Sequence, residues 1–211
     1  MKTEALIEAL AADTKIERPI LGTLVLWLVP AIALAAMAIH LILGFRDDLL
    51  MSLFTPLSVM RFALTAALGL IGVRLALLLA RPEGRGLARL WPLAAVAAVA
   101  LGLLVWAYFA TPAGGRQMAL VGKTMVTCLV TIPLLSILPV TAILMSMRNG
   151  ATTAPALAGF VAGVAGSGFA SMVYAMHCTE DSPLFYVTWY GIAIMMVAVV
   201  STLIGSRVLR W

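Results

Sequence analysis

Charged residues are scarce in this chain. Asp, Glu, Lys and Arg make up 11% of its 211 residues and 63% are hydrophobic, and the mean hydropathy is +1.09. Soluble domains are nearer half apolar and a quarter charged. The composition therefore excludes an ordinary soluble protein and predicts an all-α integral membrane protein. At about 20 apolar residues for each spanning helix, the length suits about six helices.

Residues that bind metals or carry redox chemistry are also few. The chain has two cysteines, two histidines and no C-x-x-C sequence. These absences argue against a membrane thiol oxidoreductase and against a dedicated zinc site. Few acidic residues lie inside the apolar runs and no inverted repeat is evident, which argues against a transporter.

The net charge of +5 and the pI of 9.7 do not indicate nucleic-acid binding. The basic residues lie between apolar runs, which is the pattern of the positive-inside bias in membrane proteins. Turn-forming sequences such as RPEGRG and RNGATTAP separate these runs. We expect six spanning helices, over residues 20–43, 54–79, 90–110, 119–146, 155–176 and 184–206.

The distribution of Lys and Arg predicts the orientation of these helices. Two basic residues, Arg46 and Arg116, lie in the connections on one side. Because cytoplasmic loops carry the excess of basic residues, the sequence predicts cytoplasmic N- and C-termini. Nine basic residues lie on the side that holds both termini: Lys2, Lys15, Arg18, Arg81, Arg85, Arg89, Arg148, Arg207 and Arg210.

Residues 1–19 do not resemble a secretory signal, because they contain four acidic residues. We expect the apolar run that follows to remain as the first anchor, and we treat residues 1–19 as a cytoplasmic segment and 20–211 as the membrane domain. Leu6, Ile7 and Leu10 fall on one side of a helical pattern, which suits binding in the groove of a partner protein. A solvated tail is the alternative.

The connection between the last two spans concentrates reactive side chains. It places His177, Cys178, Glu180 and Asp181 within five residues, on the side opposite the termini. Asp181 and Ser182 also fit the start of a helix, with Pro183 in its first turn.

The second cysteine, Cys128, is predicted in the outer half of the fourth span. Three interpretations of Cys128 and Cys178 stay open on spacing alone: two unrelated buried residues, a structural or redox-responsive disulfide, or a sensor of soft metal ions or thiol reagents. In the last case His177 is a further candidate ligand, since thiolate and imidazole suit such ions.

Arg61 is predicted inside the second span, and an intramembrane charge is a candidate functional residue. Its expected partners are Asp47, Asp48, Glu180 or Asp181, unless it extends to the surface. His40, near the outer end of the first span, is a candidate for the same group.

Small residues recur every four positions in the span 155–176. Gly159, Gly163, Ser167 and Ser171 form one such row. Small residues let helices approach closely in lipid, so we expect this helix to pack inside the bundle.

Several sequences together resemble the NrsF-type family. They are MKTEALIEALAAD at the start, RNGATTAPALAGFVAGVAG, HCTEDSPLFYVTWY, and GSRVLRW at the end. The resemblance implies a six-helix inner-membrane protein that holds an extracytoplasmic-function sigma factor of the sigma F type inactive and releases it under heavy-metal or oxidative stress. It also implies that two cysteines sense the signal, and these correspond to Cys128 and Cys178.

We therefore expect a bacterial inner-membrane anti-sigma factor and not an enzyme. Its partners would be the sigma factor and the lipid bilayer, with no direct contact to nucleic acid. No cofactor is required; a transient metal ion at Cys128 and Cys178 is the one ligand expected. The alternative is a small membrane transporter or metal permease.

Overall fold

The computed structural model describes Thr3, Ile7 and residues 20–210. Its long helices are α2 (Ile20–Ile42), α4 (Pro56–Leu79), α6 (Trp91–Ala110), α8 (Met125–Met147), α9 (Pro155–Tyr174) and α10 (Pro183–Val208). Short helical segments join some of them: α3 (Leu49–Ser52), α5 (Gly84–Leu87), the 3-10 turn η1 (Ala113–Gly115) and α7 (Arg116–Val121). The described residues contain no strand, so the predicted all-α fold is confirmed.

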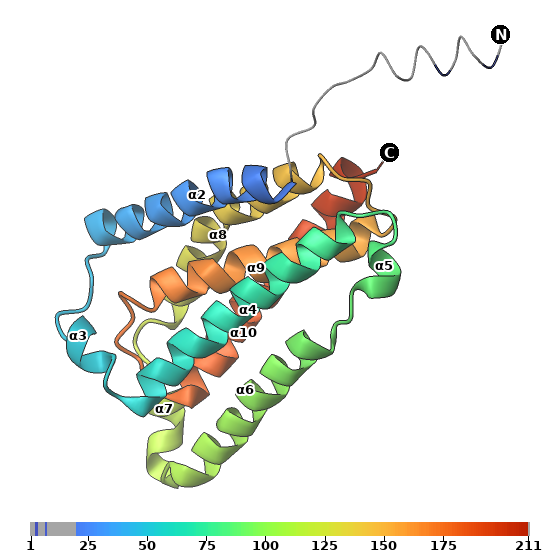
Figure 1. The fold of residues 1–211 in the computed structure, drawn as a ribbon. Coiled ribbons are helices and arrows are strands. Elements are labelled where there is room, and N and C mark those ends of the chain that lie inside the picture. The colour runs from blue at the N-terminus through green and yellow to red at the C-terminus, as the bar shows by residue number, and fades with distance from the viewer. Residues whose placement is uncertain (1–2, 4–6, 8–19, 211) are drawn as a thin grey trace.

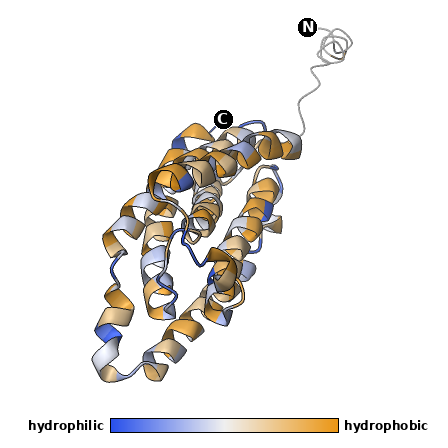
Figure 2. Ribbon diagram, turned by 90° about the vertical axis from the view of Figure 1, so that its left-hand side faces the viewer, coloured by the Kyte–Doolittle hydropathy of each residue, from blue (hydrophilic) through white to orange (hydrophobic). Residues whose placement is uncertain are grey.

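Within the described residues, six helices are long and apolar enough to cross a membrane, as the sequence predicts. Their most apolar windows have mean hydropathies between 1.6 and 2.3. Figure 2 shows hydrophobic residues along the helices and hydrophilic residues mainly in the connections.

Helix α9 lies at the centre of the bundle (Figure 1), in contact with α2, α4, α8 and α10. The six long helices alternate in direction, so the connections gather at two ends. We call the end that holds α3, α7 and residues 175–182 the α3 end. The end that holds α5, residues 148–154 and the C-terminus of α10 is the α5 end.

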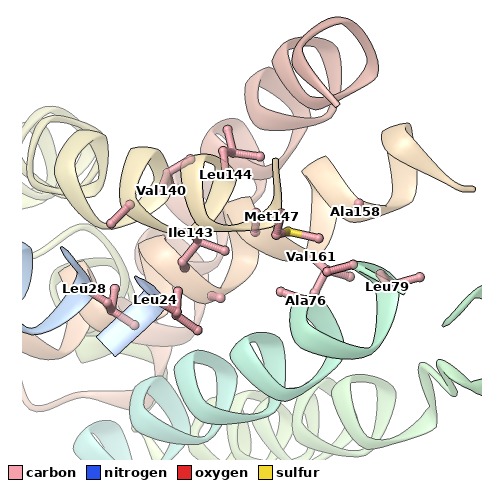
Figure 3. Close-up of a cluster of buried hydrophobic side chains, with 14 of the residues drawn as sticks. Leu24, Leu28, Ala76, Leu79, Val140, Ile143, Leu144, Met147, Ala158 and Val161 are labelled. Atoms are coloured by element: carbon pink, nitrogen blue, oxygen red, sulfur yellow. The ribbon is translucent and has the colours of Figure 1, made fainter. Parts of the chain in front are cut away.

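Two groups of buried apolar side chains fill the bundle, one near each end. At the α5 end, Leu24 of α2, Leu79 of α4, Ile143 of α8 and Val161 of α9 converge (Figure 3). The second group lies at the α3 end and includes residues of α2, α8, α9 and α10. We call it the α3-end cluster.

Close packing of small residues explains the central position of α9. Most of its residues are buried, and 78% of its most apolar window lies inside the protein. A Cβ atom on Gly163 would lie 2.6 Å from Cα of Ala198 in α10, and one on Gly72 of α4 would lie 2.7 Å from Cβ of Ala165. The expectation that this helix packs inside the bundle is confirmed, because only glycine permits these approaches.

Helix α6 is the least buried of the long helices. Its only buried residue is Ala107, and its main contacts are with α4 and α10. In Figure 1 it runs along the edge of the bundle, away from α2 and α8.

One predicted helix is interrupted. The run 119–146 was expected to be continuous, but α7 ends at Val121 and α8 begins at Met125. Gly122 between them has a φ of +57°, which L side chains rarely adopt. The next backbone N–H, that of Lys123, donates to Glu180 Oε1 at 2.8 Å. The turn is therefore fixed by a residue 57 positions away, which helical periodicity does not reveal.

Replacing Gly163 by Ala tests the packing of α9 on α10. The added methyl group would overlap the backbone of Ala198, so we expect a loss of about 1–3 kcal/mol of stability, the usual range for overpacking. Thermal unfolding in detergent measures it. Gly102→Ala on α6 is the control, because a Cβ atom there meets nothing within 4 Å. Equal melting temperatures for the two variants would contradict the packing described.

Candidate functional site

Residues 175–182, here called the cysteine loop, join α9 to α10 at the α3 end. Backbone bonds and side chains hold this loop against two other connections. The Arg46 N–H donates to Met176 O at 3.0 Å, and His177 Nδ1 lies 2.9 Å from Gly44 O. The Glu180 carboxylate accepts the Lys123 N–H described above. The cysteine loop therefore contacts both the α2–α4 connection and the turn that begins α8.

The flanking helices determine where the loop begins and ends. The N–H groups of His177 and Cys178 both donate to Tyr174 O and close the last turn of α9. Pro183 stands in the first turn of α10, as expected, and Ser182 precedes it in an extended conformation without a side-chain cap. Asp181 does not cap the helix through its side chain but turns toward two arginines.

Asp181 is the centre of an ionic group that we call the Arg–Asp network, made of Arg46, Asp48, Ser58, Arg61 and Asp181. Arg46 donates from Nη1 and Nη2 to the two carboxylate oxygens of Asp181 at 2.9 and 3.0 Å. It also donates to both oxygens of Asp48 at 2.7 and 2.8 Å. The Ser58 hydroxyl donates to Asp181 Oδ1 at 2.7 Å.

Arg61 is completely buried. Its Nη2 lies 3.1 Å from Asp181 Oδ1, and its Nη1 donates to Glu180 O at 2.9 Å. A weaker bond at 3.3 Å joins Nη2 to Ala175 O. Among the four partners considered from sequence, Asp181 is thus the carboxylate that pairs with Arg61 in the described part of the chain. A buried guanidinium requires such a counter-ion, because an unpaired charge in an apolar interior is strongly destabilising.

The network shifts the titration of its members. Hydrogen bonds to Asp48 and then to Asp181 raise the pKa of the Arg46 guanidinium, and the bond from Arg46 lowers the pKa of Asp48. Burial raises the pKa of Asp181, but hydrogen bonds from Arg46 and Ser58 and the charges of Arg61 and Arg46 outweigh burial. The pKa of Asp181 is therefore lowered, and the carboxylate is ionised at neutral pH.

Both cysteines are fully buried and neither forms a disulfide. They belong to the same α3-end cluster. Cys128 lies in the first turn of α8, where its N–H donates to Thr124 O at 2.9 Å. The Thr124 hydroxyl lies 3.8 Å from Cys178 Sγ. The structure therefore brings together the two thiols that the sequence places 50 residues apart.

Aromatic side chains surround the thiols. The rings of Tyr174 and Tyr190 meet edge to face, 5.7 Å apart, and both residues belong to the α3-end cluster with the two cysteines. All of these side chains are buried, so a reagent reaches the sulfur atoms only when the structure opens locally.

The three candidate metal ligands do not form a preformed site. Cys128, Cys178 and His177 are not brought together as a metal-binding group, and residues 20–210 contain no such group of three or more side chains. Instead the His177 ring contacts Gly44 O and lies 5.9 Å from the Tyr174 ring. Of the three candidates, Cys128 and Cys178 share one cluster, and His177 contacts a different connection.

The remaining candidates from sequence are dispersed. His40 is exposed and packs on Phe45, with ring centroids 4.7 Å apart, so it does not join the Arg–Asp network. Ile7 is exposed, whereas Leu6 and Leu10 lie outside the described residues.

Arg46, Ser58 and Thr124 were not identified from sequence as members of the site. From the sequence, Arg46 is identified only as a basic residue on the side opposite the termini. The neighbouring Asp48 is the local sign that Arg46 forms an ion pair. Ser58 and Thr124 have no distinguishing pattern, because their partners lie far away in the chain.

Comparisons with known proteins place this chain in a family. The model of a family described as negative regulator of sigma F matches residues 10–211. The probable anti-sigma-F factor NrsF of Azospira oryzae is 33% identical over 217 residues, and the anti-sigma-F factor NrsF of Caulobacter vibrioides is 31% identical. Each alignment covers 100% of both chains. No solved structure matches the chain.

The lowered pKa of Asp181 predicts how its contribution to stability depends on pH. A carboxyl group whose pKa is lower in the folded protein stabilises the fold above its unfolded pKa, and this stabilisation is lost as the pH falls through the folded value. The ordinary value is 3.8. The difference in melting temperature between the protein and Asp181→Asn should therefore be constant from about pH 8 to about pH 5 and shrink below about pH 4. A difference that already disappears at about pH 6 would contradict the ion pairs of Asp181.

Proposed function

Because this chain belongs to the NrsF family of negative regulators of sigma F, we propose that it is a membrane-embedded anti-sigma factor controlled by Cys128 and Cys178. As the names of its relatives indicate, it is a regulatory protein and not an enzyme. The full-length family match carries the anti-sigma assignment. The burial of both thiols in one cluster supports their assignment as the control point.

The α5 end faces the cytoplasm and the α3 end faces the outer compartment. The exposed arginines of the described chain support this orientation, because the α3 end has fewer basic residues, and its Arg46 is neutralised by Asp48 and Asp181. The exposed arginines of the α5 end are Arg81, Arg85, Arg89, Arg148, Arg207 and Arg210.

The sigma factor binds at the α5 end and to residues 1–19. An anti-sigma factor must reach a cytoplasmic protein, and the long helices leave only short connections there. Leu6, Ile7 and Leu10 are the proposed contacts, since an apolar stripe on a short helix fits a partner's groove. Ile7 is 61% exposed, so it is available for such a contact.

The signal acts on the two thiols in one of two ways. A two-electron thiol oxidant from the outer compartment removes two electrons and two protons from Cys128 and Cys178 and leaves an S–S bond. Alternatively, a soft metal ion displaces the two protons and binds both sulfur atoms. Either event draws the start of α8 and the cysteine loop together. Because these groups are now packed without a covalent link, the cluster must rearrange, and the sigma factor is released.

Replacing the cysteines tests this mechanism. In the unaltered protein we expect a soft metal ion or oxidant to induce a sigma F-dependent promoter by about 5-fold or more, the lower end of typical allosteric coupling. This induction should be lost in Cys128→Ser, in Cys178→Ser and in the double variant. Ala193→Ser adds a hydroxyl to the same cluster but removes no thiol, and it should respond normally. Membrane amounts are compared by immunoblot. A normal response of the double variant would contradict control by the cysteines.

Capture of the sigma factor tests the cytoplasmic surface. Tagged protein is purified from native membranes of unstressed cells, with and without residues 1–19, and bound proteins are identified by mass spectrometry. We expect the sigma factor with the full chain and not with the truncated one. Ile7→Ala should weaken capture, whereas Glu8→Ala, outside the apolar stripe, should not. Absence of a sigma factor from the full-chain sample would contradict the anti-sigma function.

A further inference from the structure

We propose that the Asp181 carboxylate is a latch that holds the cysteine loop on α4, and that opening this latch transmits the state of Cys178 through α4 to the α5 end. The proposal rests on the proposed function, because it concerns how the sensing end acts on the sigma-binding end. It assigns a positioning role to Asp181, Arg61 and Ser58, none of which reacts with the signal.

The two arginines hold the loop on both sides of Cys178. Arg61 donates to Ala175 O before the cysteine and to Glu180 O after it. Arg46 Nη1 lies 3.3 Å from the carbonyl oxygen of Cys178 itself. Both guanidinium groups also meet the Asp181 carboxylate. The backbone around Cys178 and the side chain of Asp181 are therefore fixed by the same two cations.

The charges make this arrangement dependent on Asp181. The network contains two guanidinium groups and two carboxylates, those of Asp48 and Asp181. Among the described residues the one ion pair of Asp48 is with Arg46, and Asp181 is the counter-ion of the buried Arg61. If the cysteine loop moves and takes Asp181 away, Arg61 is left charged in an apolar interior, which is strongly unfavourable. Arg61 and the helix that carries it must then shift.

The exposure of Asp181 and the incomplete hydrogen bonding of Arg61 favour opening of the latch. The Asp181 side chain is 33% exposed, whereas that of Arg61 is 0% exposed. Arg61 Nε is buried and has no hydrogen-bond partner among the described residues, so the guanidinium is held by one edge only. Moving the guanidinium therefore breaks no hydrogen bond at this nitrogen.

Helix α4 connects this latch with the opposite end of the bundle. Ser58 and Arg61 lie in its first turns and Leu79 is its last residue. Directly after it, Ala80 O accepts the Ala151 N–H at 2.8 Å, and Pro82 O accepts the Thr153 hydroxyl at 3.1 Å. One helix therefore carries the latch at one end and holds the 148–154 connection at the other (Figure 1).

The contact of α4 with α9 favours movement of α4 as a unit. Cβ atoms on Gly69 and Gly72 would lie 2.8 Å from the Phe169 ring and 2.7 Å from Cβ of Ala165. Gly72 thus faces a small residue of α9, whereas Gly69 leaves room for the Phe169 ring. Small sliding of packed helices is a common form of conformational switching. A displacement that begins at Arg61 then reaches residues 148–154 without a break in the helix.

Two measurements on Asp181→Asn test the proposal. The first is the rate at which a membrane-impermeant maleimide modifies Cys178 in spheroplasts, with Cys128→Ser present so that one thiol remains. We expect a rise of at least about tenfold, because modification of a buried thiol follows the population of the opened loop. The second is expression from a sigma F-dependent promoter in unstressed cells with both cysteines present. It should rise toward the level of a strain that lacks the protein.

Asp47→Asn is the matched control, because Asp47 is an exposed neighbour of Asp48 in the same connection and forms no ion pair in the described residues. It should leave both measurements unchanged. If Asp181→Asn does not accumulate in membranes, the same two measurements are made on Ser58→Ala. This variant removes one hydrogen bond to the same carboxylate and leaves all charges in place. It should raise both measurements to a smaller extent.

The outcomes separate the latch from the proposed function. Unchanged labelling of Cys178 in the variant that accumulates overturns the latch. Increased labelling with normal promoter expression overturns transmission through α4. If the strain without the protein shows no rise in promoter expression, the anti-sigma function itself is wrong, whatever the labelling shows. A rise in both measurements together, with Asp47→Asn normal, supports the proposal.

Discussion

A charged guanidinium group can remain buried in an apolar bundle only while oxygen atoms accept its hydrogen bonds. Arg61 is such a group, and the chain at the α3 end must supply these oxygen atoms. Its oxygen partners in the described part of the chain belong to the cysteine loop: Ala175, Glu180 and Asp181. Satisfying Arg61 therefore fixes the path of the chain around Cys178. The same loop then supplies Glu180 to the turn before α8, which sets where Cys128 lies. One buried charge is therefore bound by the same loop that carries Cys178 and that contacts the turn before Cys128.

The rest of the bundle connects this arrangement with the opposite end. Helix α9 leads directly into the cysteine loop, and its small residues hold it against α4, α8 and α10. The apolar groups at the two ends are separate, so a rearrangement at the α3 end need not disrupt packing at the α5 end. A protein with this construction can change one end in response to chemistry and report it at the other. This is what the proposed function requires.

Much of this could be predicted from sequence, because the deciding signals are local. Six apolar runs gave the six long helices, and the row of small residues in 155–176 indicated that this helix is central. His177, Cys178, Glu180 and Asp181 were recognised as a group because they are neighbours in the chain. The partners of that group were not predictable in the same way. Arg46 and Asp181 are 135 positions apart, and the break at Gly122 depends on the distant Glu180. Neither contact produces a periodic pattern in the sequence. Spacing identifies a face of a helix, but not which distant side chain will meet it.

The central claim is that the thiol state at the α3 end sets the affinity for the sigma factor at the α5 end. Its most direct test is reconstitution of the purified full chain in lipid vesicles with the sigma factor bound on the accessible α5 side. A thiol oxidant is added in steps, and the fraction of protein with a Cys128–Cys178 bond is measured by mass spectrometry alongside the fraction of sigma factor still bound. The account predicts that the two fractions change in parallel and that a thiol reductant reverses both. Complete formation of the bond with no loss of bound sigma factor would contradict it.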